Sequence, residues 1–324
     1  MDSRIPRRRF LESIGALAAG AAASSLPWTV LHATERLYPP ADLSYFDRPI
    51  SRAAARIHIG YAAITWNGND RQAIDDIAAL GYPGIQLRSN CIKEFASARE
   101  VRDLLEQHHL KMVALSSGSI KIDPGVEADQ MATTVSHAQF TRDAGGLYLQ
   151  VIADRPKDRP ITADDYQRMG HLLTEIGKRT ADLGVSLGFH NHMGSLGQSP
   201  EEVEQIMDAC DPRYAKLLLD IGHYYQGGGD PAKAIEKYHD RLLFLHIKDV
   251  EELPQSTDPK HTYRWAELGR GKVDIPATFA ALKRVKFHGW AVVELDSEPD
   301  ASRTPKESAA AAEEYLKERI GVTV

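Results

Sequence analysis

The sequence predicts a (β/α)8 TIM barrel, which belongs to the α/β class. Strand-like and helix-like stretches alternate eight times from residue 56 to the C-terminus, as in a parallel barrel. The strand-like stretches are short aliphatic runs, whereas the helix-like ones carry apolar residues at helical spacing. No glycine-rich turn follows the first strand, where Ala62-Ala63-Ile64-Thr65-Trp66 stands. A doubly wound sheet, the alternative, usually has such a turn.

The eight units can be placed along the chain. The strands are expected at residues 57–62, 85–87, 112–115, 147–152, 185–189, 217–219, 242–247 and 291–295. The helices are expected at residues 72–80, 98–108, 128–144, 163–183, 200–210, 231–239, 276–285 and 304–320. Ser199-Pro200 and Asp230-Pro231 each place an N-cap residue before a proline at the first helical position. Gly81 and Gly184 follow the last apolar turn of their helices.

The N-terminus looks like a twin-arginine export signal. Arg7-Arg8-Arg9-Phe10-Leu11 precedes an uncharged run of small residues from Ile14 to Ala23. This run is short for a bilayer span, and an uncleaved anchor remains the alternative. We therefore expect a signal peptide at 1–33, a linker or surface wrap at 34–55 and the barrel at 56–324. The twin-arginine translocase would be a partner during export, and the mature protein would be periplasmic.

Composition limits the partners. The net charge of -6 and pI near 6.1 provide no basic field for nucleic acid, so no nucleic-acid partner is expected. The two cysteines, Cys91 and Cys210, are too few for a disulfide framework. We interpret them as buried thiols, with a single bond between them as the alternative.

Four predicted strands in the second half of the chain end on side chains that can bind a metal. The strings are Phe189-His190-Asn191-His192, Leu219-Asp220-Ile221-Gly222-His223, Leu245-His246-Ile247-Lys248-Asp249 and Val293-Glu294-Leu295-Asp296. Because the strands of a parallel barrel all end at one mouth, these side chains should meet there. Imidazole and carboxylate together suit a divalent transition metal with open positions for a substrate. Alternation places His192 on the same side as His190, just beyond the strand end.

Several strings together carry a family resemblance. They are residues 60–66, residues 190–194 followed by Glu201-Glu202-Val203, residues 220–223 with Gly228-Gly229-Asp230-Pro231, and residues 246–249, 269–274 and 289–294. With them, the region from Ile57 to the C-terminus resembles the xylose-isomerase-like barrels of the sugar phosphate isomerase/epimerase superfamily. Within this superfamily it is most similar to the inosose dehydratases. The resemblance implies a divalent metal (Mn, Co, Mg or Zn) held by His190, Asp220, His246 and Glu294, and barrels of this family often form homo-oligomers.

One departure from the family pattern bears on the reaction. Sugar isomerases and epimerases of this superfamily usually carry glutamate at the position of His190, and they use it with the last-strand glutamate as opposed acid and base. The second strand also has Gln86 where an acidic residue is frequent. A histidine leaves the metal site intact but favours chemistry with one base and one acid, such as β-elimination from a keto sugar.

The expected function is therefore a metal-dependent lyase. It would act on a keto sugar, keto-glycoside or inosose through a metal-stabilised enediolate. Candidate bases are Lys248, His192 and Glu294, and His223 is a candidate acid or orienting residue. Trp66 and Trp265 are candidates for packing on a sugar face, with core packing as the alternative. Arg88 and Arg270 are candidates for substrate contacts, with solvated rim charges as the alternative.

Other functional classes remain open. The runner-up is a sugar isomerase or epimerase. A second alternative is a non-catalytic periplasmic sugar-binding barrel. Such a protein would not need the four predicted metal ligands, which argues against it. A phosphodiesterase of the apurinic endonuclease type shares the fold, but it would need more metal ligands and a basic groove, whereas this chain is acidic.

Overall fold

The computed structural model describes residues 55–253, 262–299 and 302–324. The predicted signal peptide (1–33) and all but the last residue of the predicted linker (34–55) lie outside these described residues. Within the described ranges, no helix is long and apolar enough to cross a membrane.

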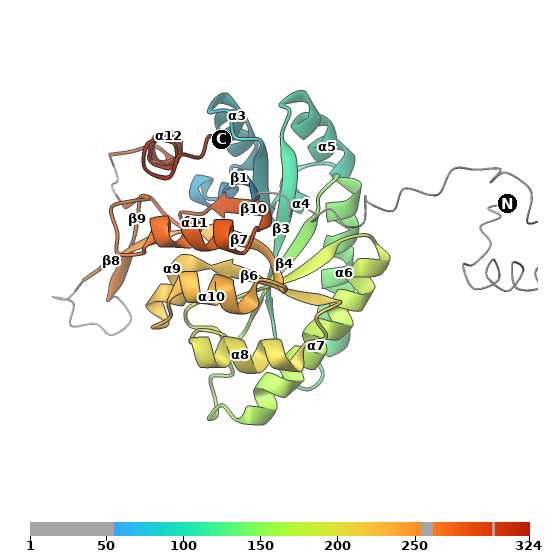
Figure 1. Cartoon of the computed structure of the whole chain (residues 1–324). Helices are drawn as coiled ribbons and strands as arrows, with labels where there is room; N and C mark the ends of the chain where they lie inside the picture. Colours follow the sequence, from blue (N-terminus) through green and yellow to red (C-terminus); the bar gives the residue numbers. More distant parts are fainter. Residues whose placement is uncertain (1–54, 254–261, 300–301) are drawn as a thin grey trace, which may run out of the picture. The chain divides into compact units, whose positions relative to one another are not determined.

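Eight parallel strands close into a barrel in the order β1-β10-β7-β6-β5-β4-β3-β2. The strands are β1 (Arg56–Ala62), β2 (Gly84–Arg88), β3 (Lys111–Ile120), β4 (Tyr148–Ala153), β5 (Ser186–His190), β6 (Ala215–Asp220), β7 (Leu242–Ile247) and β10 (His288–Val293). Figure 1 shows the helices arranged around these strands. The (β/α)8 prediction is confirmed, and each barrel strand lies within a few residues of its expected position.

The outer ring contains the eight predicted helices and a few short additions. The predicted ones are α3 (Asp70–Ala79), α5 (Ala98–Gln107), α6 (Glu127–Asp143), α7 (Ala163–Asp182), α8 (Pro200–Ala209), α10 (Pro231–Tyr238), α11 (Ile275–Arg284) and α12 (Pro305–Tyr315). The additions are η2 (Ala63–Trp66), α4 (Cys91–Glu94) and α9 (Ile221–Gln226), whereas η3 (Leu316–Ile320) is the π-helical end of the last predicted helix (304–320). A single turn carries too little periodicity to be recognised in a sequence.

The helix caps form as the sequence predicts. The Ser199 hydroxyl accepts from the backbone N–H of Glu202, whose carboxylate accepts in return from the backbone of Ser199. The Asp230 carboxylate accepts from the N–H groups of Ala232 and Lys233. A proline fills the first position of both helices, where no N–H partner is needed. These caps fix where α8 and α10 begin relative to the strand ends.

The structure adds a two-stranded antiparallel hairpin that was not expected. It consists of β8 (Asp249–Glu252) and β9 (Tyr263–Ala266), with Val250 paired to Trp265. It directly follows β7 and therefore stands at the mouth of the barrel. Each strand has only four residues, too few for a clear alternating pattern.

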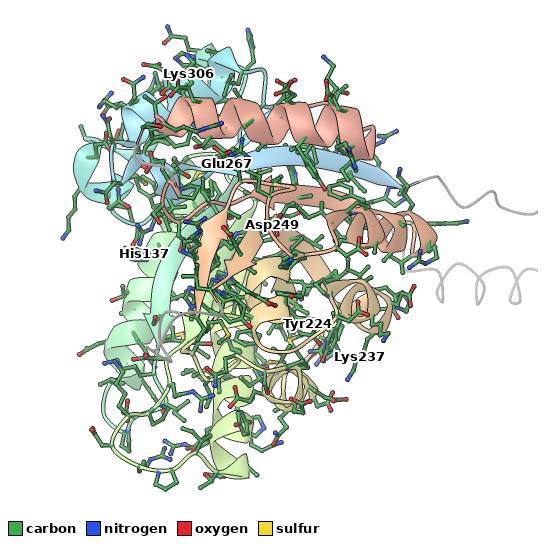
Figure 2. All side chains as sticks on the ribbon, turned by 90° about the vertical axis from the view of Figure 1, so that its left-hand side faces the viewer. His137, Tyr224, Lys237, Asp249, Glu267 and Lys306 are labelled. Atoms are coloured by element: carbon green, nitrogen blue, oxygen red, sulfur yellow. The ribbon has the colours of Figure 1, made fainter. Side chains whose placement is uncertain are left out.

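The base of this hairpin is held by Asp249, labelled in Figure 2. Its buried carboxylate accepts from the backbone N–H groups of Val250, Gly269, Gly271 and Val273 at 2.9–3.1 Å. A Cβ at Gly271 would lie 2.1 Å from Oδ1 of Asp249, so only glycine allows this approach. Asp249, the last residue of one strand-end string, thus ties the hairpin to the loop before α11.

A carboxylate pair near the first βα loop leads to a stability prediction. Asp70 is buried at the start of α3, where it accepts from Nδ2 of Asn90 at 2.7 Å. Glu94 accepts the backbone N–H groups of Asp70 and Arg71. Burial, together with the neighbouring Glu94 carboxylate, raises the pKa of Asp70 to about 7.

Asp70→Asn is therefore expected to stabilise the protein more at pH 8 than at pH 5. The unfolded chain loses the Asp70 proton near pH 4, whereas the folded protein keeps it until about pH 7. Wild-type stability thus falls across this window, and the neutral amide removes the loss, on the order of 2 kcal/mol. Thermal unfolding of both proteins at the two pH values measures it. A difference in Tm that is constant with pH would contradict the assignment.

Candidate metal and active site

Four side chains from the ends of strands β5, β6, β7 and β10 converge in the barrel mouth. They are His190, Asp220, His246 and Glu294, each at most 5% exposed. One potential ligand atom from each lies within 4.8 Å of all the others. This is the meeting of strand ends that the sequence predicts for a parallel barrel.

The facing atoms have the arrangement of a cation site. Oδ2 of Asp220 lies 3.3 Å from Nε2 of His190 and 3.4 Å from Nδ1 of His246. Oε2 of Glu294 lies 3.3 Å from the same Nδ1. This buried Nδ1 has no hydrogen-bond partner, which is unusual unless another group binds it. Two imidazole nitrogens and two carboxylate oxygens form a donor set that fits a divalent transition metal.

The electrostatics of the two histidines differ. Burial lowers the pKa of His190 to about 4, so this ring is neutral. Burial also disfavours a charge on His246, but the carboxylates of Glu294 and Asp220 outweigh it and raise its pKa to about 9. The two carboxylates therefore favour positive charge at this point in the barrel.

Asp220 serves the local fold and the cluster at once. Its Oδ1 accepts from the backbone N–H of His223 at 2.8 Å and caps α9, while Oδ2 faces the histidines. Asn191 links the ends of β5 and β6, because its side chain accepts from the N–H of Asp220 and donates to its carbonyl. The two oxygens of one carboxylate thus cap α9 and face the cluster.

Two buried glutamines inside the barrel orient the two histidine rings. Oε1 of Gln86 lies 2.9 Å from Nε2 of His246, and Nε2 of Gln86 donates to Oε1 of Gln150 at 2.8 Å. Gln150 in turn lies 2.7 Å from Nδ1 of His190. Oε1 of Gln86 thus holds the His246 ring with Nδ1 toward the carboxylates, as the outer partner of a metal ligand does. The amide nitrogen of Gln150 donates to Nδ1 of His190 and holds that ring with Nε2 toward Asp220.

Lys248 lies beside the cluster, fully buried. Its Nζ donates to Glu294 at 2.8 Å and to Asp296 at 3.0 Å, and it lies 3.3 Å from Oδ2 of Asp220. Burial disfavours the charged form, but these three carboxylates outweigh it and raise the pKa of Lys248. Gly222 leaves room for the lysine stem, since a Cβ there would lie 2.8 Å from Cγ of Lys248. The amine is therefore protonated in the resting protein.

His192 and His223 cover the cluster on the side of the mouth. Their ring centroids are 3.8 Å apart, and both rings pack near His190. Nδ1 of His192 lies 2.7 Å from the Met193 carbonyl, to which it donates in the neutral ring, so that Nε2 keeps a lone pair. Nδ1 of His223 lies 3.1 Å from Oε1 of Gln226, and its Nε2 is 3.4 Å from Nζ of Lys248.

A cavity of about 740 Å³ opens beside these two histidines. Its wall includes Tyr263 and Trp265 from the hairpin and Met193 from the loop after β5. The Trp265 ring lies over Nζ of Lys248, 4.4 Å from the ring centroid. Trp265 of the hairpin therefore lines the cavity and also contacts Lys248 beside the cluster.

Of the predicted substrate residues, Trp265 lines this cavity, whereas Trp66, Arg88 and Arg270 do not. Trp66 is 7% exposed, and its indole N–H donates to Asp76 at 2.9 Å, so core packing accounts for it. Arg88 lines a separate, smaller cavity, and Arg270 is largely exposed and paired with Glu267. The sequence missed Gln150, because a glutamine within a strand gives no distinguishing signal. It also assigned no role to Asn191 or Asp296, although both belong to the strand-end strings.

Comparisons with known proteins agree with this geometry. Residues 74–319 match the xylose isomerase-like TIM barrel family. An inosose dehydratase from Lacticaseibacillus casei is 27% identical over 300 residues, which cover 82% of this chain and 98% of that protein.

Two solved structures are similar in fold. The IOLI protein, solved with a binding zinc atom, has a TM-score of 0.70 at 18% identity and covers 80% of this chain and 96% of its own. The probable 3-DHS dehydratase AsbF from Bacillus anthracis has a TM-score of 0.66 at 14% identity and covers 81% and 99%. Since the family match spans most of the barrel and its strand-end cluster, this chain belongs to the xylose isomerase-like TIM barrel family.

Proposed function

We propose that this protein is a metal-dependent sugar dehydratase or eliminase, a carbon-oxygen lyase that acts on a keto sugar, keto-glycoside or inosose. The observation that carries the proposal is the buried His190, Asp220, His246 and Glu294 cluster with a protonated Lys248 beside it. The inosose dehydratase relative supports a lyase, since that name describes loss of water from a keto cyclitol.

The proposed metal is a divalent cation held by the four cluster residues. Nδ1 of His246, which has no hydrogen-bond partner, and the two carboxylates that face it are potential ligand atoms for this cation. Two imidazoles favour a transition metal such as Mn, Co or Zn over Mg, and the structurally similar IOLI protein was solved with zinc. When bound, such a cation supplies a Lewis acid for a substrate carbonyl.

Side chains next to the metal site carry out the proposed proton transfers. In the proposed elimination, the carbon next to the carbonyl loses a proton to Nε2 of His192, and the electron pair forms a carbon-carbon double bond. The carbon-oxygen bond one carbon further breaks, and the departing oxygen takes a proton from Lys248 and leaves as water or an alcohol. His223 orients Lys248. Glu294 is a poorer base, because Oε1 is bonded to Lys248 and Oε2 faces His246.

The deciding experiment is turnover of the metal-loaded protein with inososes and 3-keto-glycosides in deuterated water, followed by mass spectrometry. Loss of water or release of the aglycone supports the lyase. Deuterium incorporation and a stereoisomer without any such loss would establish the runner-up, an isomerase or epimerase. That alternative has less support here, because His190 stands where a two-carboxylate mechanism needs an acid.

Gln150→Leu is expected to weaken Mn binding by at least about tenfold. Leucine has a similar volume but removes the partner of His190, so the ring is no longer fixed toward the carboxylates. Isothermal titration of the metal into the metal-free protein measures the affinity. Gln107→Leu, at the exposed end of α5, is the matched control. An unchanged affinity in a folded Gln150→Leu protein would show that the ring needs no such partner.

The cellular location is a separate proposal based on the N-terminal arginines. We infer that the twin-arginine translocase exports the protein to the periplasm, since Arg7-Arg8-Arg9-Phe10-Leu11 precedes an uncharged run. Replacing Arg8 and Arg9 by lysine should keep the protein in the cytoplasm on cell fractionation. Continued export of that variant would exclude this route.

A further inference from the structure

The cavity beside the cluster is larger than the reacting ring of the proposed substrates requires. Its volume is about 740 Å³, and His192 and His223 form part of its wall. Cavities of roughly 300–1,000 Å³ typically hold drug-sized ligands. A single six-membered polyol ring placed at the cluster would leave most of this space empty.

The wall of the cavity also includes two aromatic and two other apolar side chains. Tyr263 and Trp265 come from β9, and Met193 and Pro299 come from the loops after β5 and β10. Trp265 is held in place, since it lies over Lys248 and meets the His223 ring edge-on at 5.0 Å. Fixed aromatic side chains of this kind bind planar or apolar groups.

The charges around the cavity argue against an anionic ligand. Among the described residues that line it, Arg264 is the one arginine or lysine, and its guanidinium is paired with Glu251 at 2.6 Å. Glu298 adds a carboxylate to the wall. Lys248, behind Trp265, is already bonded to carboxylates. A phosphate or carboxylate would be desolvated there without an available cation.

From these three observations we propose that the cavity is a second subsite, which binds an uncharged planar group attached to the reacting ring, such as an aryl aglycone. The substrate class is then a neutral aryl keto-glycoside rather than a free inosose or a sugar phosphate. This inference rests on the proposed function and narrows it. The aglycone would lie against Tyr263 and Trp265 while the sugar faces the cluster.

The test compares binding of phenyl β-glucoside and methyl β-glucoside to the full, Mn-loaded protein by isothermal titration calorimetry. Neither ligand has the keto group needed for elimination, so binding is measured apart from turnover. The phenyl glycoside is expected to bind at least about tenfold more tightly. Tyr263→Ala should remove most of this preference and leave methyl glucoside affinity within about twofold. Tyr225→Ala, whose hydroxyl donates to Glu252 of the same hairpin outside the cavity wall, should keep it.

Equal affinities, failure of either glycoside to bind, or a preference that survives Tyr263→Ala would overturn the subsite. These outcomes are distinct from failure of the proposed function. Water loss from an inosose without any phenyl preference would leave the lyase standing and remove the subsite. A phenyl preference that depends on Tyr263, without elimination from any keto substrate, would leave the subsite and remove the lyase.

Discussion

His246→Ala is expected to abolish metal binding and to lower activity by more than about a thousandfold, since a bound Lewis acid supplies several kcal/mol of transition-state stabilisation. The variant removes the one cluster atom that has no other partner, Nδ1 of His246, which faces both carboxylates. Without it, Asp220 and Glu294 repel each other, and only the three ligands His190, Asp220 and Glu294 remain to hold the cation.

Metal content after gel filtration, measured by elemental analysis, and turnover of a keto substrate check this prediction. His171→Ala is the matched control, because this histidine is exposed on α7. It should retain both the metal and the activity. Stoichiometric metal in the His246→Ala protein would show that the cation binds elsewhere.

Lys248→Met is expected to destabilise the protein by about 3 kcal/mol, because removal of one partner leaves buried carboxylates uncompensated. Glu294 and Asp296 lose their closest cation, at 2.8 Å and 3.0 Å. Activity should fall at least about a hundredfold through loss of the proposed acid. Saturating metal should return part of the stability, since a cation offsets the same carboxylates.

Chemical unfolding with and without Mn, combined with steady-state kinetics, separates these effects. The variant should still bind metal, which distinguishes it from His246→Ala. Lys248→Arg tests whether a positive charge alone restores stability and activity. This variant is expected to restore neither, because the lysine stem packs against Gly222 and leaves no room for the wider guanidinium group. Unchanged kcat in Lys248→Met would exclude Lys248 as the proton donor and leave His223 as the candidate.

Much of the fold could be predicted because it depends on local patterns. Aliphatic runs, helical spacing and caps such as Ser199-Pro200 are properties of neighbouring residues. The hairpin β8–β9 escaped prediction because its strands have four residues each and owe their position to Asp249, whose carboxylate binds backbone N–H groups as far along the chain as Val273. No local pattern contains that contact.

The two tryptophans show the same limit within the site. Trp66 and Trp265 were equal candidates for a sugar contact. Trp66 follows β1, and its indole is tied to Asp76 in the core, whereas Trp265 is carried by the hairpin to a position over Lys248. Which of them borders the cavity depends on the side chain that each ring meets in the folded protein, and the residue type alone does not reveal it.

The sequence by itself determined the barrel and the four strand-end side chains His190, Asp220, His246 and Glu294. It could do so because parallel strands must all present their ends at one mouth. Only the tertiary structure decided how these side chains are oriented, through Gln86 and Gln150, and which surface lies beside them. Gln150 comes from β4, next to the strand of His190, whereas Gln86 comes from β2, which β1 and β10 separate from the strand of His246. The chain of contacts from His246 through Gln86 and Gln150 to His190 therefore depends on closure of the whole sheet rather than on any stretch of sequence.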